Sequence, residues 1–403
     1  MTSSVSDNVR LAAAGPPSER SAGCDILETP CFVFDEAVLS AQIDRLTRLA
    51  RTCGVKPLYS IKACPLGALL ERIAPRVDGF SVSSLFEARL ARQALGNRGT
   101  VHLTTPGLSA EDAAGLAGIC DYLSFNSLSQ QRRLAPLLDE GIAIGLRINP
   151  RLSLVGDERY DPCRRHSKLG VPLDDLVRWL GDDPDGARGL TGLHFHTHHD
   201  SPDLTPLAVT VEALMKALPQ VFASIAWLNL GGGYRLEAET HGADRLAEVL
   251  DRLRRQWPVE VFVEPGKAVI DDVGTLIATV LDVFESDGAV VAILDTSVNH
   301  LPEAFEYQRP PVIAEATGGG YRCILAGGTC LAGDLFGEYE FPSPLAPGAR
   351  LTFTGVGAYT LVKAHRFNGH NLPAVALRVA DGGTRVIKRH DYADFSRQWS
   401  ADR

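Results

Sequence analysis

A regular alternation of strand-like and helix-like segments between residues 36 and 275 constrains this fold more than any other feature of the sequence. Eight short apolar segments have strand character: residues 58–61, 79–82, 101–103, 122–125, 142–148, 192–195, 226–230 and 259–263. Amphipathic helical patterns precede and separate them, at 36–53, 66–73, 85–95, 110–119, 129–138, 173–179, 207–222 and 243–256. Such alternation predicts a parallel sheet, and eight strand–helix units close a (β/α)8 barrel. We therefore expect an α/β protein with a TIM-like barrel.

The pattern changes after residue 272. Short β-type runs follow, with Gly- and Pro-containing turns and little helix, at residues 275–284, 289–294, 321–325, 351–353, 374–379 and 384–387. They predict a C-terminal all-β domain, which the apolar run around Phe32 is expected to join. Residues 1–22 are rich in Ser, Ala and Pro and predict a flexible tail. The expected units are therefore this tail, a barrel at 36–275, and a β-domain formed by 23–35 and 276–403.

The net charge and the distribution of the cysteines indicate which partners and which compartment to expect. A formal net charge of −9 argues against a nucleic-acid or membrane-surface partner. No apolar run approaches the length of a membrane span. The eight cysteines are scattered without CxxC pairs, which fits free thiols in a reducing cytoplasm. We expect a cytoplasmic enzyme that acts on a small molecule.

Polar residues gather where the predicted barrel strands end, which is where barrels of this kind carry their chemistry. The candidates are Lys62, Arg147, His196, Gly231, Gly232, Gly233 and Glu264. Taken singly, a strand-end lysine is usually a solvated charge and a Gly triplet an ordinary tight turn. On one rim, however, a lysine amine, backbone amides that can hold phosphate, and a carboxylate suit pyridoxal phosphate. The lysine would form the Schiff base, and the carboxylate would keep the pyridine nitrogen protonated.

The segment HFHTHHD at residues 194–200 allows three interpretations. Strand alternation places His194, His196 and His198 on one side, as in a metal site. The imidazoles are alternatively hydrogen-bonded within the barrel, or one of them packs on the ring of the cofactor. Without HExxH or a matching carboxylate pair no metal is predicted, and ring stacking by His196 is preferred because the other cofactor residues are present. The roles of His198 and His199 stay open.

The predicted β-domain contains a second group of candidates. Cys330 and Asp334 lie in the Gly-rich segment AGGTCLAGD at 326–334. A cysteine there is usually a small buried filler, but an exposed thiol next to an acid suits a proton donor. Asp295, His300 and Tyr359 lie on other segments of this domain, and sequence spacing alone does not place them at the barrel.

A set of short segments, in the same order along the chain, resembles the fold type III pyridoxal-phosphate-dependent basic amino acid decarboxylases, whose relatives include ornithine and diaminopimelate decarboxylases. The segments are TPCFVFD (29–35), SSLFEAR (83–89), FNSLSQ (125–130), GLRINP (145–150), SKLG (167–170), GLHFHT (192–197), WLNLGGG (227–233), ILDTS (293–297), GTCLAGD (328–334) and FNGHNLP (367–373). As a set they are specific, and they look most similar to the carboxynorspermidine and carboxyspermidine decarboxylases.

The resemblance implies roles for the barrel residues. Lys62 would be the Schiff-base lysine, and Glu264 would pair with the pyridine nitrogen. His196 would stack on the cofactor ring and Arg147 would help to position it. The glycines Gly231, Gly232 and Gly233 would cradle the phosphate.

The resemblance also implies roles for the β-domain. Tyr359 would contact the cofactor, Cys330 would protonate the carbanion, and Asp334 would contact the distal amine of the substrate. His199, Asp295 and His300 complete the substrate-binding residues that we expect. In this family Cys330 and Asp334 would reach the barrel of the partner subunit, which implies a head-to-tail homodimer.

The sequence departs from the carboxynorspermidine pattern at four places: HHDS at 198–201, Tyr234-Arg235, Lys267, and VNHLP at 298–302. These places bear on the substrate more than on the reaction. We therefore predict decarboxylation of an amino acid with a cationic tail, such as carboxynorspermidine or carboxyspermidine, giving a polyamine. The alternatives are a decarboxylase of another amino acid in specialised metabolism, an amino acid racemase, and a non-catalytic protein that binds the cofactor.

Overall fold

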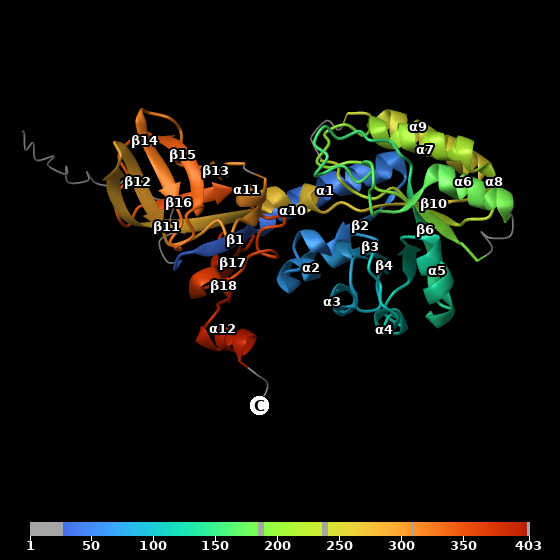
Figure 1. Cartoon of the computed structure of the whole chain (residues 1–403), viewed down its shortest axis with the longest axis horizontal. Helices are drawn as coiled ribbons and strands as arrows, with labels where there is room; N and C mark the ends of the chain where they lie inside the picture. The colour runs from blue at the N-terminus through green and yellow to red at the C-terminus, as the bar shows by residue number, and fades with distance from the viewer. Residues whose placement is uncertain (1–26, 184–188, 236–240, 308, 401–403) are drawn as a thin grey trace, which may run out of the picture.

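The computed structural model describes residues 27–183, 189–235, 241–307 and 309–400. The strands of these residues form two separate sheets, which lie side by side along the long axis of the molecule (Figure 1). The predicted tail at 1–22 and Cys24 lie outside the described residues.

The first sheet is a closed barrel of parallel strands. Its strands are β2 (Lys56–Ser60), β3 (Gly79–Val82), β4 (Thr100–Thr104), β5 (Tyr122–Phe125), β6 (Ala143–Asn149), β8 (Gly192–His194), β9 (Trp227–Asn229) and β10 (Glu260–Val263). Each pairs in parallel with the next, and β10 pairs with β2 to close the ring. A short strand, β7 (Val171–Pro172), pairs with the end of β6 outside the ring. The predicted TIM-like barrel is confirmed.

Helices surround the barrel. They are α1 (Glu36–Cys53), α2 (Gly67–Ile73), α3 (Leu85–Leu95), α4 (Ala110–Ala114), α5 (Leu128–Leu134), α6 (Leu173–Asp182), α7 (Thr205–Ala217), α8 (Pro219–Phe222), α9 (Ala243–Gln256) and α10 (Lys267–Ile270). Helix α1 begins where the Asp35 carboxylate accepts hydrogen bonds from two backbone amides of the first turn, and it ends at the left-handed Gly54.

Two predicted helices are shorter than expected. The helix predicted at 110–119 ends at Ala114, because Gly115 and the left-handed Gly118 favour a turn. The helix predicted at 207–222 is divided into α7 and α8, because Pro219 has no amide hydrogen with which to continue α7.

The second sheet is mixed. It consists of β1 (Cys31–Asp35), β11 (Gly274–Ser286), β12 (Ala289–Leu294), β13 (Val312–Ile313), β14 (Tyr321–Ala326), β15 (Leu335–Phe341), β16 (Arg350–Thr354), β17 (Ala374–Arg378) and β18 (Thr384–Lys388). As expected, the strand around Phe32 joins it, antiparallel to β11 and parallel to β17. Strand β15 and the helices α11 (Pro302–Glu306) and α12 (Tyr392–Trp399) do not appear in the sequence prediction.

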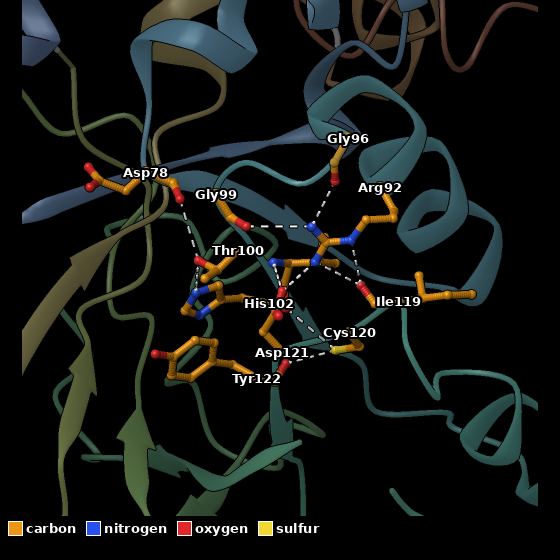
Figure 2. Close-up of polar contacts among 11 residues, drawn as sticks. Asp78, Arg92, Gly96, Gly99, Thr100, His102, Ile119, Cys120, Asp121 and Tyr122 are labelled. Carbon is orange, nitrogen blue, oxygen red and sulfur yellow. Dashed lines mark hydrogen bonds and ion pairs between the residues drawn. The ribbon is translucent and has the colours of Figure 1, made fainter. Parts of the chain in front are cut away.

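Aromatic rings fill the amino end of the barrel. A Cβ atom on Gly145 or Gly192 would lie 2.3 or 2.0 Å from the indole of Trp227, so these two glycines leave the space that the indole occupies. His102 stacks on Tyr122 with ring centroids 4.1 Å apart, and Figure 2 shows the two rings side by side. This end is therefore closed, and any cavity for ligands lies at the carboxyl ends of the strands.

The loops at the closed end are fastened by one arginine. Arg92 of α3 donates hydrogen bonds to the carbonyl oxygens of Gly96, Gly99 and Ile119 and forms an ion pair with Asp121 (Figure 2). No helix within the described ranges is both long and apolar enough to cross a membrane.

Candidate active site

The carboxyl ends of the barrel strands surround a cavity of about 460 Å³, here called the mouth cavity. A cavity of this size can hold a cofactor with a small substrate. Five residues that the sequence predicts for the site line it: Lys62, Arg147, His196, His199 and Glu264. His194 and His198 line it as well, so the histidine-rich segment faces the cavity.

Lys62 is held at the mouth by the turn that follows β2. The sequence places it at the end of the strand, but β2 ends at Ser60 and Lys62 lies in the 3-10 turn Ile61–Ala63. The Ser60 amide donates to the carbonyl of Pro265 at 2.9 Å, which fixes this turn next to the residues after β10. The side chain of Lys62 is exposed only toward the mouth cavity, where desolvation by the surrounding barrel lowers its pKa, Glu264 opposes that shift and Arg147 adds to it.

Glu264 follows β10 and is a buried carboxylate, with only 6% of its surface exposed. The side-chain amide of Asn229 donates to its Oε1 at 2.8 Å, and Nε2 of His194 lies 3.7 Å from its Oε2. Burial alone would raise the pKa of Glu264, but His194 and Lys62 hold it below its usual range. The carboxylate is therefore ionised near neutral pH, and it lines the same cavity as Lys62.

The glycine triplet is packed more tightly than a free loop. A Cβ atom on Gly231, Gly232 or Gly233 would lie 2.1 to 2.3 Å from a backbone oxygen of the residues after β8 and β10. The Gly231 amide donates to Oδ1 of Asn229 at 2.9 Å, and the Gly232 amide donates to Nδ1 of His196 at 3.1 Å. Two of the three amides predicted to hold phosphate thus have partners within the chain.

The Gly232 hydrogen bond also fixes the state of His196. Its Nδ1 accepts a hydrogen bond, so in the neutral ring the proton is on Nε2. Desolvation lowers the pKa of His196 well below its usual range, and the nearby Lys62 and Arg147 lower it further. His196 is therefore a neutral imidazole whose orientation is set by the glycine turn.

Three of the departures from the family pattern meet in one ion cluster. The Asp200 carboxylate accepts two hydrogen bonds from Arg235, at 2.7 and 2.9 Å, and one from Lys267 at 3.2 Å. Burial would raise the pKa of Asp200, but Arg235 and Lys267 lower it to about 2. The cluster ties together the segments that follow β8, β9 and β10.

The long segment after β6 forms one wall of the mouth cavity and was not predicted as part of the site. It contributes Arg164, Lys168 and Tyr160. The Tyr160 ring stacks on His199 with centroids 4.5 Å apart and also contacts Tyr307 of the second sheet domain at 4.5 Å. The hydrophobic periodicity that revealed the barrel gives no signal for this irregular wall.

Tyr359 is placed next to the lysine turn. Its backbone amide donates to the carbonyl of Ala63 at 2.8 Å, so the second sheet domain contacts the turn that holds Lys62. Burial raises the pKa of the Tyr359 hydroxyl above its usual range. Its side chain is therefore neutral at physiological pH.

Cys330 does not line the mouth cavity of its own chain. Its thiol is exposed, unlike those of the six other described cysteines, all of which are buried. The hydrogen-bond partner of this thiol is an amide and not the acid expected beside it. Sγ lies 3.0 Å from Oδ1 of Asn368, which also accepts a hydrogen bond from the Cys330 amide at 3.1 Å. Asn368 belongs to the FNGHNLP segment, whose reach to Cys330 could not be derived from spacing.

Asp334 is buried, and its carboxylate is hydrogen-bonded to groups of its own chain. It accepts hydrogen bonds from Ser297 Oγ at 2.9 Å, the Val298 amide at 2.8 Å and Thr329 Oγ1 at 2.5 Å. These bonds join the Cys330 segment to the residues after β12. Contact between Asp334 and a substrate would require it to release one of these donors.

Asp295 and His300 likewise have internal partners. Asp295 accepts from Thr29 Oγ1 at 2.6 Å and from the Thr279 amide at 2.8 Å, which fastens β12 to β11 and to the residues before β1. Nδ1 of the buried His300 lies 3.0 Å from Thr296 Oγ1, and burial lowers its pKa to about 4. In a single chain neither residue lines the mouth cavity.

The mouth cavity fits pyridoxal phosphate by its donor set. It has the amine of Lys62, the ionised buried carboxylate of Glu264, the neutral imidazole of His196, and further cations at Arg147, Arg164 and Lys168 for anionic groups. Within the ranges described above, no three His, Cys, Asp or Glu side chains are placed to hold a metal ion. Carboxylate, imidazole and amine together suit a protonated pyridine ring.

Known proteins are similar to this chain in sequence and in structure. A family model described as "Pyridoxal-dependent decarboxylase, C-terminal sheet domain" matches residues 31–357. A carboxyaminopropylagmatine decarboxylase of Synechocystis sp. is 32% identical, over 92% of this chain and 95% of the relative. A carboxynorspermidine/carboxyspermidine decarboxylase of Herminiimonas arsenicoxydans is 28% identical, over 92% and 99%. The crystal structure of carboxynorspermidine decarboxylase with norspermidine from Campylobacter jejuni superposes with a TM-score of 0.81 at 25% identity, covering 92% and 100%.

Proposed function

The chain belongs to the pyridoxal-dependent decarboxylases, and on this premise we propose that it removes the α-carboxylate of an amino acid with a cationic tail, yielding a polyamine. Its cofactor is pyridoxal 5'-phosphate. The observation that supports the proposal most is the mouth cavity, which Lys62, His196 and Glu264 all line. The alternative of a protein without activity would not require all three.

The proposed substrates are three related amino acids. Carboxynorspermidine and carboxyspermidine follow from the sequence, and carboxyaminopropylagmatine is added because a relative of 32% identity is named for it. The first two end in an ammonium group and the third in a guanidinium group. His199 and Tyr160 line the cavity and are the residues of this chain that we propose to contact the tail.

Each barrel residue has a proposed task. Pyridoxal phosphate supplies an aldehyde for amines and a ring that accepts the electrons released with CO2. Lys62 would bind the cofactor, and its lowered pKa favours the neutral, nucleophilic amine. The ionised Glu264 would hold a proton on the ring nitrogen, His196 would pack against the ring face, and Arg147 would orient bound anionic groups.

The phosphate site is proposed at the turn Gly231, Gly232 and Gly233. Because two of these amides already donate within the chain, phosphate would be bound by sharing or replacing those partners. Tyr359 lies beside the lysine turn and is the proposed cofactor contact from the second sheet domain.

Cys330 is the proposed donor of the proton that replaces CO2 at Cα. Since its exposed thiol lies outside the cavity of its own chain, we propose a homodimer in which the thiol enters the partner's cavity. Asp334, Asp295 and His300 would shape the Cys330 side of that site, with direct contact to the substrate only after a change of partners.

Two further proposals concern the whole chain. The barrel would form one domain, at 36–275, and residues 23–35 with 276–403 the other; β11, which begins at Gly274, starts within two residues of that boundary. A cytoplasmic location is proposed because the eight cysteines of the sequence are scattered without CxxC pairs.

A product screen tests the proposal. The purified enzyme is given carboxynorspermidine, carboxyspermidine, carboxyaminopropylagmatine, ornithine, lysine and diaminopimelate, each labelled with ¹³C at the carboxylate, and ¹³CO2 and amine products are measured by mass spectrometry. Release of CO2 from one of the first three is the expected result. Racemised amino acid without CO2 would favour the racemase, and release from ornithine, lysine or diaminopimelate alone would refute the polyamine assignment.

A further inference from the structure

One buried amide connects the residues proposed to face the cofactor. Asn229 is the last residue of β9 and is only 1% exposed. Its Nδ2 donates to Oε1 of Glu264 at 2.8 Å, and its Oδ1 accepts from the amide of Gly231 at 2.9 Å. The next amide, of Gly232, donates to Nδ1 of His196. Glu264, the glycine turn and His196 are therefore held by three neighbouring hydrogen bonds, two of which involve the Asn229 side chain.

The orientation of the Asn229 amide is determined by its partners. An ionised carboxylate only accepts hydrogen bonds and a backbone amide only donates them, so the NH2 group must face Glu264 and the oxygen must face Gly231. An aspartate in this position could serve Gly231 but could not donate to Glu264. The site therefore requires an uncharged donor and acceptor in one side chain.

The opposite oxygen of Glu264 faces a different group. Nε2 of His194 lies 3.7 Å from Oε2, beyond direct hydrogen-bond distance, and His194 is itself buried. Of the side chains described around Glu264, Asn229 is the one with a hydrogen bond to its carboxylate. The rotation of that carboxylate thus depends on Asn229.

We propose that Asn229 is a positioning residue: it holds the Glu264 carboxylate in one orientation toward the mouth cavity and couples it to the glycine turn. This inference rests on the proposed function, because it assigns Glu264 to the ring nitrogen and the turn to the phosphate. As a consequence, one side chain would position the protein groups at both ends of the cofactor, at the ring nitrogen and at the phosphate. Loss of Asn229 would weaken both.

The test measures cofactor affinity by a double-mutant cycle. The full-length enzyme is stripped of cofactor and titrated with pyridoxal phosphate, and Kd is determined for wild type, Asn229→Ala, Glu264→Gln and the double variant. We expect Asn229→Ala to raise Kd about tenfold in the wild-type background, equivalent to about 1.4 kcal/mol, and by a smaller factor when Glu264 is already Gln, because only the contribution of the glycine turn then remains to be lost. Equal effects in the two backgrounds would overturn the coupling.

Asn229→Asp provides a second, charge-specific readout. Two adjacent carboxylates resist ionising together, so one of them would take up a proton and the bound cofactor would lose its pyridine proton at lower pH than in wild type. The pH dependence of the visible absorbance of the bound cofactor reports this change. An unchanged pH profile in Asn229→Asp would refute the proposal.

Thr191→Val is the matched control. It also removes two side-chain hydrogen bonds near β9, but at the closed end of the barrel. The Trp227 indole N–H donates to the Thr191 hydroxyl, and that hydroxyl donates to the Ile144 carbonyl, each at 3.0 Å. We expect Thr191→Val to lower Tm about as much as Asn229→Ala does, without changing the Kd for pyridoxal phosphate. If Thr191→Val raised Kd as much as Asn229→Ala, Asn229 would be merely structural. Wild-type enzyme that fails to bind the cofactor would instead refute the proposed function.

Discussion

The two halves of the proposed site are organised in opposite ways. In the barrel half, Lys62, His196 and Glu264 line one cavity, and hydrogen bonds from Gly232 and Asn229 hold the His196 and Glu264 side chains. In the second sheet domain, the carboxylates of Asp334 and Asp295 accept hydrogen bonds that join segments of the domain, while the Cys330 thiol is exposed. The comparison indicates that the barrel supplies a pre-formed cofactor site, and that the other half supplies a rigid support for one exposed reactive group.

Lys62→Ala should have the largest effect, and it tests the barrel half. Without its amine the chain loses the group proposed to bind the cofactor covalently, so we expect activity to fall by roughly a thousandfold or more. The visible absorbance of the bound cofactor should disappear as well. Lys168→Ala, which removes another lysine of the same cavity, is the control, and retention of the absorbance in Lys62→Ala would contradict the assignment.

Cys330→Ala should separate the contribution of the second sheet domain to activity from the contribution of the barrel to cofactor binding. We expect kcat to fall by about 10² to 10⁴ while cofactor binding is unchanged, because the thiol is proposed to act only on Cα. The buried Cys323→Ala is the matched cysteine control.

Mixing the Lys62→Ala and Cys330→Ala variants tests whether the thiol acts in the cavity of the partner subunit. If the thiol enters the partner's cavity, a mixed dimer of Lys62→Ala and Cys330→Ala has one intact site, and random re-association restores about a quarter of wild-type activity. No recovery, in a mixture shown by native mass spectrometry to contain mixed dimers, would refute the shared site.

A substitution of Asp334 distinguishes a structural role of this carboxylate from a role in substrate binding. Asp334→Ala leaves several buried donors without an acceptor, so we expect a loss of about 2–3 kcal/mol in the free energy of unfolding. Denaturant unfolding measures it, with the exposed Asp381→Ala as control. A raised KM for the cationic substrate with unchanged stability would contradict the supporting role.

The sequence predicted the barrel half well because its signals are local. Strand periodicity locates the strand ends, and Lys62, His196 and Glu264 follow from them. Asn229 was missed because nothing in WLNLGGG distinguishes a buried bridging amide from a polar residue in a turn. The neighbour of Cys330 was wrongly expected to be an acid, because Asn368 approaches it from 38 residues away. Long-range contacts of this kind depend on the packing of the second sheet.

The junction between the halves should show the smallest effect, a change in how stability depends on pH. Asp271 lies between α10 and β11, and burial raises its pKa to about 7, with Lys267 opposing the shift. In the unfolded chain the same group titrates near 4. Between about pH 4 and pH 7 the folded state therefore binds more protons than the unfolded state, and this group makes stability fall as pH rises through that window.

Asp271→Asn should remove that contribution, because the amide does not titrate. We expect the free energy of unfolding of the variant, measured by denaturant titration, to decline less than that of wild type between about pH 4 and pH 7. Asp381→Asn, at an exposed aspartate far from Asp271 in the sequence, is the control and should keep the wild-type slope. Identical slopes for Asp271→Asn and wild type would mean that the junction accommodates the ionised carboxylate, with Lys267 fully offsetting its burial. The two halves would then be joined by an ion pair rather than by a protonated acid.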